Sequence, residues 1–151
     1  MAAKDETPYV ETVDTSYLET LVGYNARRAA LFVIGNFMER MAVFDLRTVD
    51  FSVLSLIHHN AGITSRQLCS HLNILAPNMV VMLNGLERKK LVERRPHPLD
   101  GRATGLHLTP KGQSLMVEAE DAAYQLEMDS TSRLTATERN TLVRLLKKIY
   151  K

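Results

Sequence analysis

The sequence predicts a mainly α-helical protomer with one small β-hairpin. Three observations favour this fold class. Apolar residues recur at the three- and four-residue spacing of amphipathic helices along most of the chain. Thr or Asp residues that can cap helix N-termini precede these apolar runs. One short stretch instead alternates apolar and polar residues beside a loop rich in proline and glycine, which is typical of a hairpin.

The first predicted helix begins at Asp14 or Thr15, after a polar and acidic tail, and continues to about residue 46. Its apolar residues cover more than half of the helix circumference: Leu18, Leu21, Val22, Ala26, Ala29, Phe32, Val33, Phe37, Met38, Met41 and Phe44. A helix at the surface of a monomer has one apolar stripe. The second apolar side therefore predicts packing against a partner chain.

Two shorter helices follow. Asp50 is predicted to cap a helix over 51–59, which the Asn-Ala-Gly sequence after it ends. Thr64 and Gln67 form the pattern of a capping box, in which each side chain bonds the backbone N–H of the other residue. This pattern predicts a helix that starts at residue 65 and ends near residue 71.

A fourth helix is predicted over 76–89, after a turn at 73–75. Pro77 suits the first turn, because its missing N–H would have no helical partner there. The apolar residues of this helix share one face: Met79, Met82, Leu83 and Leu86. Lys89 and Lys90 lie at the end, where cations favour the helix dipole.

The hairpin is predicted next, with strands over 91–95 and 105–108 and a loop over 96–101. Two helices joined by a short turn and followed by a basic hairpin make a winged helix-turn-helix. The fold class is therefore mainly α with a small β-hairpin wing, and the winged helix-turn-helix occupies about residues 50–109.

The last two helices complete a single protomer of residues 1–151. Thr109 and Pro110 start the first of them, a break follows at 129–132, and Thr135 with Glu138 forms a second capping box. The last helix carries an apolar stripe: Leu142, Leu145, Leu146 and Ile149. With the first helix it has more apolar surface than one core can bury, so residues 14–46 and 110–150 are predicted to be dimerisation helices.

Charge is concentrated in the middle of the chain. The net charge is +2, yet residues 64–112 hold eight Lys or Arg and three Asp or Glu, a local charge of +5. Such an excess attracts a phosphate backbone, although a solvated basic surface is an equal alternative on charge alone.

Several classes of protein are excluded or disfavoured. Cys69 is the single cysteine, so there is no intramolecular disulfide framework. No secretory signal or apolar run of membrane-spanning length is visible, and we expect a cytoplasmic protein that does not contact membranes. No catalytic motif is found, which argues against an enzyme. His58, His59 and His71 match no known ligand spacing, so neither a metal nor a cofactor is expected.

Three short motifs resemble the MarR family of bacterial regulators: LERKKLVERR over 86–95, DGRA over 100–103 and LTPKG over 108–112. In this order and spacing the resemblance covers about residues 14–150. It implies a homodimeric transcriptional regulator that binds double-stranded DNA at a pseudo-palindromic operator. Lys90 stands where the family commonly has glycine, so an unusual backbone conformation is expected there. Gly101 stands where the family commonly has arginine, which removes one cation of the wing.

The resemblance also implies which residues contact DNA. The helix after the turn would enter the major groove with Leu75, Pro77, Asn78 and Val81, and Asn78 can pair with adenine. Residues at or near the wing follow: Arg94, Arg95, His97, Asp100 and Arg102. Arg102 would reach a minor groove or its phosphates, and Asp100 would hold the wing by pairing with an arginine. Thr64, Ser65 and Arg66 lie at a helix N-terminus that suits phosphate, and Arg88 is as well explained by a solvated face.

Proteins of this family often bind a small aromatic or acidic effector beside the dimerisation helices. The run GYNARRA over 23–29 resembles the branch that controls aromatic-acid catabolism and responds to hydroxycinnamoyl-CoA thioesters or phenolic acids. Candidate ligand residues share aromatic, sulfur or cationic groups: Tyr24, Arg27, Arg28, Phe37, Met41, Phe51 and His58. Such aromatic residues and a histidine like His58 are more often core residues than ligand contacts, and the two arginines can also be a solvated face or partners of Glu39 or Asp45.

Two other functions stay open. The regulator could sense a different small anion or no ligand at all. The winged helix could instead bind another protein. Arginines at 94, 95 and 102 favour DNA, because a protein-docking wing would present apolar residues.

Overall fold

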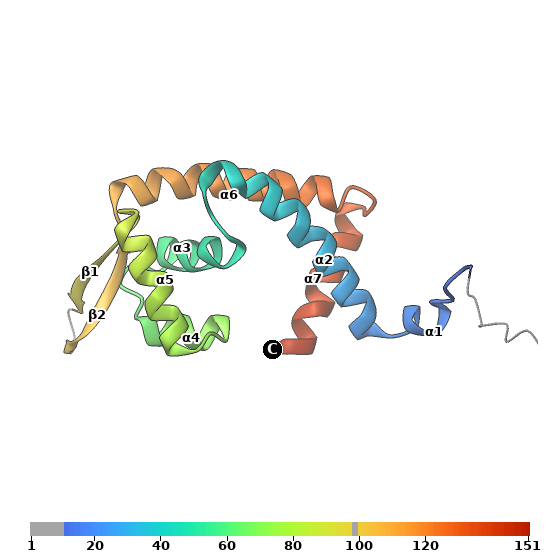
Figure 1. The fold of residues 1–151 in the computed structure, drawn as a ribbon, viewed down its shortest axis with the longest axis horizontal. Coiled ribbons are helices and arrows are strands. Elements are labelled where there is room, and N and C mark those ends of the chain that lie inside the picture. The colour runs from blue at the N-terminus through green and yellow to red at the C-terminus, as the bar shows by residue number, and fades with distance from the viewer. Residues whose placement is uncertain (1–10, 98–99) are drawn as a thin grey trace, which may run out of the picture. The chain divides into compact units, whose positions relative to one another are not determined.

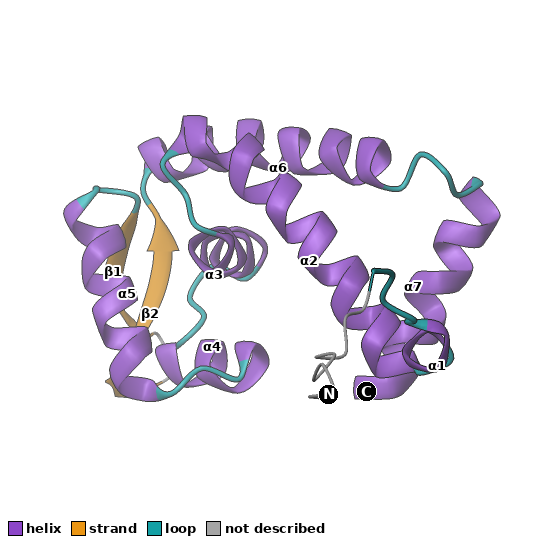
Figure 2. Ribbon diagram, turned by 45° about the vertical axis from the view of Figure 1, so that its right-hand side comes forward, coloured by secondary structure: helices purple, strands orange, loops and turns teal. Residues whose placement is uncertain are grey.

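The computed structural model describes residues 11–97 and 100–151, with the side chains of all of these except 97 and 100–103 (Figure 1). The elements follow in the order α1 (Ser16–Glu19), α2 (Val22–Met41), the 3-10 helix η1 (Ala42–Phe44), α3 (Thr48–His59), α4 (Ser65–Leu72), α5 (Ala76–Arg88), β1 (Val92–His97), β2 (Asp100–Leu108), α6 (Pro110–Ser130) and α7 (Ala136–Tyr150). Figure 2 shows that helices dominate and that the strands form one hairpin, as the sequence predicts. The described residues fall into two compact units divided between Phe32 and Val33.

The start of the first unit differs from the single long helix predicted from residue 14 or 15. Helix α1 ends at Glu19, and α2 begins only at Val22. The Asn25 side-chain amide donates hydrogen bonds to the carbonyls of Glu19 and Leu21, both at 2.8 Å, and the Thr20 hydroxyl donates to the Tyr17 carbonyl. These side chains satisfy carbonyls at the break, which makes the interruption of the helix possible.

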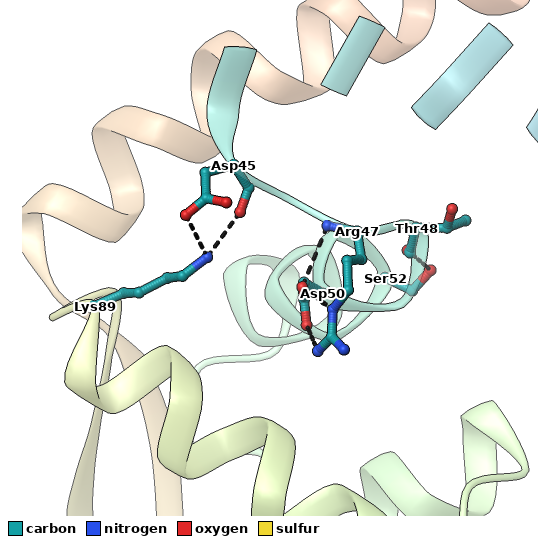
Figure 3. A network of polar contacts seen from close by, with 6 residues as sticks. All are labelled: Asp45, Arg47, Thr48, Asp50, Ser52 and Lys89. Atoms are coloured by element: carbon teal, nitrogen blue, oxygen red, sulfur yellow. Dashed lines mark hydrogen bonds and ion pairs between the residues drawn. The ribbon is translucent and has the colours of Figure 1, made fainter. Parts of the chain in front are cut away.

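The prediction that Asp50 caps the second helix was wrong. Helix α3 begins at Thr48, and Asp50 is the third residue of its first turn. The Asp50 carboxylate accepts a hydrogen bond from the backbone N–H of Arg47 at 3.2 Å, and from Arg47 Nε and Nη2 at 2.8 and 2.9 Å (Figure 3). Because this carboxylate reaches back to the residue before the helix, the helix starts three residues earlier than expected.

The other predicted helix starts are confirmed. The capping boxes of Thr64 with Gln67 and of Thr135 with Glu138 are present, and the Thr109 hydroxyl accepts from the backbone N–H of Gly112. Between α4 and α5 the turn passes through a left-handed residue, Asn73, with φ of 52°. Local patterns therefore define the helix-turn-helix.

The strands are longer than predicted. Strand β1 continues through Pro96 to His97, and β2 begins at Asp100 rather than at Gly105, so most of the residues predicted to form the loop belong to the strands. The register pairs Pro96 with Thr104 and shifts between Pro96 and His97. Proline is tolerated there because each strand of a two-stranded sheet has an edge without a partner.

The core lies within the second unit, among α3, α4, α5, the hairpin and α6. Its buried apolar side chains are Met41, Leu46, Val53, Leu54, Ile57, Ile63, Leu68, Met79, Leu83, Leu86, Leu91, Val92, Leu106, Leu108, Met116 and Ala119. The hairpin is tied to the segment between α3 and α4, since Ile63 and Leu106 form a β-bridge. Among the residues that the structure describes, no helix combines the length and the apolar character that crossing a membrane requires.

Candidate nucleic-acid interface

Helix α5 has two different faces. Met79, Leu83 and Leu86 are buried in the core. The four residues predicted to contact bases are all exposed: Leu75, Pro77, Asn78 and Val81. Leu75 and Val81 are 74% and 68% exposed although both are apolar. The structure thus brings these four side chains together at the N-terminal part of α5, on the side away from the core.

The C-terminal end of α5 is held by the start of α6. The Thr109 hydroxyl donates to the Lys90 carbonyl at 2.6 Å, and Lys111 Nζ donates to the Lys89 carbonyl at 3.0 Å. The Thr109 backbone N–H donates to the Leu91 carbonyl at 3.0 Å. Lys89, Lys90 and Leu91 directly follow Arg88, the last residue of α5. The LTPKG motif therefore binds the chain just after α5 to the start of α6.

Lys90 has an unusual backbone conformation and Gly112 an unusually close backbone contact, both near the end of α5. Lys90 has a left-handed conformation with φ of 58°, which confirms the unusual backbone expected where the family commonly has glycine. Gly112 lies so close to the chain after α5 that a Cβ there would be 2.1 Å from the Leu91 carbonyl oxygen. The glycine of the LTPKG motif therefore permits the contact between α6 and Leu91, three residues after the end of α5.

A second set of contacts joins α5 to the segment before α3. Lys89 Nζ lies 2.7 Å from Asp45 Oδ2 and donates to the Asp45 carbonyl at 2.8 Å (Figure 3). The sequence left Asp45 open as a partner for Arg27 or Arg28, and the structure pairs it with Lys89 instead. Asp45 has a left-handed backbone with φ of 52°.

Beside this pair, Asp50 is only 4% exposed. Burial raises the pKa of its carboxyl, but the hydrogen bonds and charge of Arg47, with the charge of Lys89, outweigh burial and hold the pKa below its ordinary value. The same bonds raise the pKa of the Arg47 guanidinium. A buried, ionised carboxylate thus lies next to α5.

An open groove of about 530 Å³ lies between α5 and the segment that leads into α3. Its lining combines apolar residues with three cations and two carboxylates: Ala42, Asp45, Leu46, Arg47, Asp50, Val81, Met82, Gly85, Leu86, Arg88 and Lys89. None of the seven predicted ligand residues lines it. Arg88 is exposed and lines this groove.

Two arginines of the hairpin have partners within the chain. Arg94 donates to both carboxylate oxygens of Glu87, at 2.8 and 3.1 Å, which ties β1 to α5. Arg95 pairs with Glu93 on the same strand. The backbone of Asp100 and Arg102 belongs to β2, but the side chains of His97, Asp100 and Arg102 lie outside the described residues. Their predicted contacts stay predictions.

The residues predicted to bind phosphate at the start of α4 lie where the sequence placed them. Thr64 precedes the helix, and its hydroxyl accepts from the Gln67 backbone N–H at 3.3 Å and donates to Gln67 Oε1 at 2.9 Å. Ser65 is half-buried and Arg66 is exposed. The Thr64 hydroxyl is therefore engaged in capping, whereas Arg66 is directed to solvent.

The predicted ligand residues are divided between the two units. Tyr24, Arg27 and Arg28 belong to the first, where both arginines are exposed and Tyr24 is half-buried. In the second unit, Met41 is fully buried in the core.

The two phenylalanines and His58 also belong to the second unit. The Phe37 and Phe51 rings pack edge to face, 5.1 Å apart between their centroids, and both contact the core. His58 is half-buried beside His59. Packing thus explains Phe37, Met41 and Phe51 without a ligand, an alternative that the sequence left open for the phenylalanines.

Comparison with known proteins places these features in a family. A model of the MarR family matches residues 44–103. The multiple antibiotic resistance protein MarR of Escherichia coli is 34% identical over 112 residues, which are 74% of this chain and 78% of that protein. A putative transcriptional regulatory protein for the hcr operon of Thauera aromatica is 29% identical over 131 residues, 86% of this chain and 79% of that protein.

Among solved structures, the transcriptional repressor CouR bound to a 23-mer DNA duplex has a TM-score of 0.84 and 32% identity, covering 93% of this chain and 99% of that one. CouR bound to p-coumaroyl-CoA has a TM-score of 0.81 with the same identity and coverage. The similarity thus extends well beyond the winged helix, over nearly the whole of both chains. The chain belongs to the MarR family of winged helix-turn-helix transcriptional regulators.

Proposed function

We propose that this protein is a homodimeric repressor that binds a pseudo-palindromic operator in double-stranded DNA and is released by a small aromatic acid or its CoA thioester. The observation that carries the proposal is the exposed face of α5, which has apolar and amide side chains directed away from the core while the end of the helix is anchored. The protein acts on DNA in the cytoplasm and catalyses no reaction.

In this proposal α5 enters the major groove. Asn78 pairs with a base, and Leu75, Pro77 and Val81 contact base edges or thymine methyl groups. Arg102 on β2 contacts the minor groove or its phosphates. Arg66 at the start of α4 and Arg88 on α5 contact phosphates, which orient the protein without selecting sequence. Because Arg94 is bound by Glu87, its part is to hold the hairpin against α5.

Dimerisation uses the apolar side chains that a single chain leaves exposed. In the first unit these include Leu18, Leu21, Val22, Leu31 and Phe32. In α7 they include Leu142, Val143, Leu145, Leu146 and Ile149. Apolar surface of this extent is rare on monomers and typical of interfaces. Two copies also supply the two recognition helices that two half-sites one helical turn apart require.

The effector class is supported by the similarity to CouR, which has been solved with p-coumaroyl-CoA. Tyr24, Arg27 and Arg28 in the first unit, and Phe37 and His58 in the second, remain the proposed effector contacts. Met41 and Phe51 belong to the packing of the second unit. An effector that binds the DNA-free form more tightly lowers the affinity for DNA by that difference. The alternative is a regulator that responds to a different small anion or to no ligand.

The proposal is tested by fluorescence polarisation with labelled DNA from upstream of the gene, at about 50 mM and about 200 mM salt. The protein should bind tightly, more weakly at the higher salt, and be released by p-coumaroyl-CoA or p-coumarate. Tight binding that neither compound releases would contradict the proposed aromatic effector but would still support a DNA-binding regulator. Absence of binding at both salt concentrations favours a protein-docking winged helix.

The same assay tests the wing. Arg102→Ala should weaken binding to every DNA sequence and reduce the slope of log affinity against log salt by about one phosphate contact. Arg133→Ala, an exposed arginine between α6 and α7, is the matched control and should leave the slope unchanged. An unchanged slope for Arg102→Ala would contradict the contact proposed for the wing.

A further inference from the structure

Two imidazoles and one carboxylate meet between the last turn of α3 and the middle of α6. The ligand atoms of His58, His59 and Glu120 all lie within 4.8 Å of one another. His59 Nε2 is 3.0 Å from Glu120 Oε1 and 3.1 Å from Oε2. We propose that these three side chains form a binding site for a divalent late first-row transition-metal ion such as Zn²⁺, which would join α3 to α6.

The donor set has the chemistry that such an ion requires. Imidazole nitrogen and carboxylate oxygen are common zinc ligands, with bonds of about 2.0–2.2 Å. Two ligands on a tetrahedral ion are then about 3.4 Å apart, by the same bond lengths. The His59 and Glu120 atoms are already near this separation, so rotation of side chains, without movement of either helix, can admit the ion.

The position of the two histidines on α3 is also suitable. Consecutive residues of a helix point about 100° apart, so neighbouring histidines reach one ion only when their rings turn toward each other. The rings of His58 and His59 are 4.9 Å apart between centroids and meet at 80°. His58 is half-buried and His59 is exposed.

A neighbouring hydroxyl orients the carboxylate. Ser55 Oγ, one turn before His59, donates to Glu120 Oε1 at 2.7 Å. Hydrogen bonds of this kind fix the direction of a metal ligand, and their loss typically weakens metal binding. The bond occupies one lone pair of Oε1 and leaves Oε2 for the metal. Three protein ligands leave a fourth position for water or a small anion.

The sequence concealed this site because its members are distant along the chain. Glu120 is 61 residues from His59, and only the packing of α6 on α3 brings them together. The sequence analysis considered His71 together with His58 and His59. Among the described residues, His71 is not part of the cluster, and it is exposed on α4.

The test is calorimetric titration of the tag-free, chelator-treated full-length protein with ZnCl₂, in the absence of DNA, so that its result is independent of the proposed function. One ion per chain is expected. His59→Ala and Glu120→Gln should each weaken binding about 100-fold or abolish it, and Ser55→Ala should weaken it about tenfold. His71→Ala is the control and should bind as the natural chain does.

Folding of the variants is checked by circular dichroism. His59 is exposed, and glutamine at 120 can still accept the Ser55 hydrogen bond, so both variants should fold. Substitution of Co²⁺ should give the absorption bands of a four-coordinate site in the natural chain only. Absence of saturable binding, equal binding by the natural chain and the His59 and Glu120 variants, or loss of binding in His71→Ala would overturn the proposal.

Discussion

Gly112 shows how one atom determines a contact between elements. A Cβ at this position would be 2.1 Å from the Leu91 carbonyl oxygen, so Gly112→Ala must push the first turn of α6 away from the chain that follows α5. We expect the free energy of unfolding to fall by about 3 kcal/mol. Urea denaturation at one fixed protein concentration measures this change.

The matched control is Gly85→Ala. A Cβ at Gly85 has no atom within 4 Å, and the residue lies inside helix α5. Alanine should therefore raise the stability by about 0.5–1 kcal/mol through its better helix propensity. Equal stability of Gly112→Ala and the natural chain would show that α6 and the chain after α5 do not touch as described.

Asp50 predicts how stability depends on pH. Arg47 and Lys89 lower the pKa of this carboxyl in the folded chain. In the unfolded chain the Asp50 carboxyl has its ordinary pKa of about 3.9, so it is protonated at a higher pH than in the folded chain. The stabilisation is present above that pH and is lost as the pH falls through the lower pKa of the folded chain. Asp50→Asn should therefore lose less stability than the natural chain between about pH 5 and about pH 3.

Thermal or urea unfolding across this range measures both chains. Glu138→Gln offers a comparison, since the Glu138 carboxyl is fully exposed and its pKa is lowered by hydrogen bonds from Thr135. Parallel curves for Asp50→Asn and the natural chain would contradict the ion pair with Arg47.

Helix α5 is the element for which the proposed DNA recognition gives a prediction at one base pair. Asn78→Ala should cost about 1–3 kcal/mol of binding energy for the base pair that Asn78 contacts, and little at other positions. Competition binding with operators changed at one base pair at a time measures this. Asn140→Ala, at an exposed position of α7, is the control. A uniform loss across all sequences would make Asn78 a phosphate or structural contact.

The order of the elements could be predicted from the sequence because it depends on local patterns. Thr64 and Thr135 start helices through side chains three residues away, and such patterns are visible in the sequence. The break before α2 was not predicted, because it depends on Asn25 reaching back to the carbonyls of Glu19 and Leu21. The strand lengths were missed because Pro96 resembles a loop residue, whereas the register of the hairpin decides its pairing.

The candidate site divides in the same way. Exposure of Asn78 and its neighbours on α5 follows from helical periodicity, which the sequence contains. The sequence does not show which elements pack together. The ion pairs of Arg94 with Glu87 and of Lys89 with Asp45 depend on that packing, so they could not be predicted. Met41, predicted to contact a ligand, is buried in the core. The periodicity of the sequence places Met41 on an apolar face of α2, but it does not show which residues pack against that face.

For the whole molecule, the exposed apolar stripe of α7 predicts an obligate dimer. Leu142 and Leu145 are 43% and 47% exposed in the single chain. The double substitution Leu142→Asp and Leu145→Asp would bury carboxylates in the interface, which costs about 3 kcal/mol or more. The dimer dissociation constant should rise at least about a hundredfold, and operator affinity should fall with it.

Analytical ultracentrifugation over a range of protein concentrations measures the dissociation. Arg144→Asp, on the other side of α7, controls for added negative charge and should leave the dimer intact. If the double variant remains dimeric, α7 is not part of the interface.

The two faces of α5 also bear on how such a regulator diverges. Met79, Leu83 and Leu86 maintain the core, whereas Leu75, Pro77 and Asn78 project into solvent and contribute little to it. Substitutions on the outer face can therefore change the preferred DNA sequence with little penalty in folding. A duplicated gene could acquire a new target within a few mutations. The hydrogen bonds of Thr109 and Lys111 to the chain just after α5 would be unchanged.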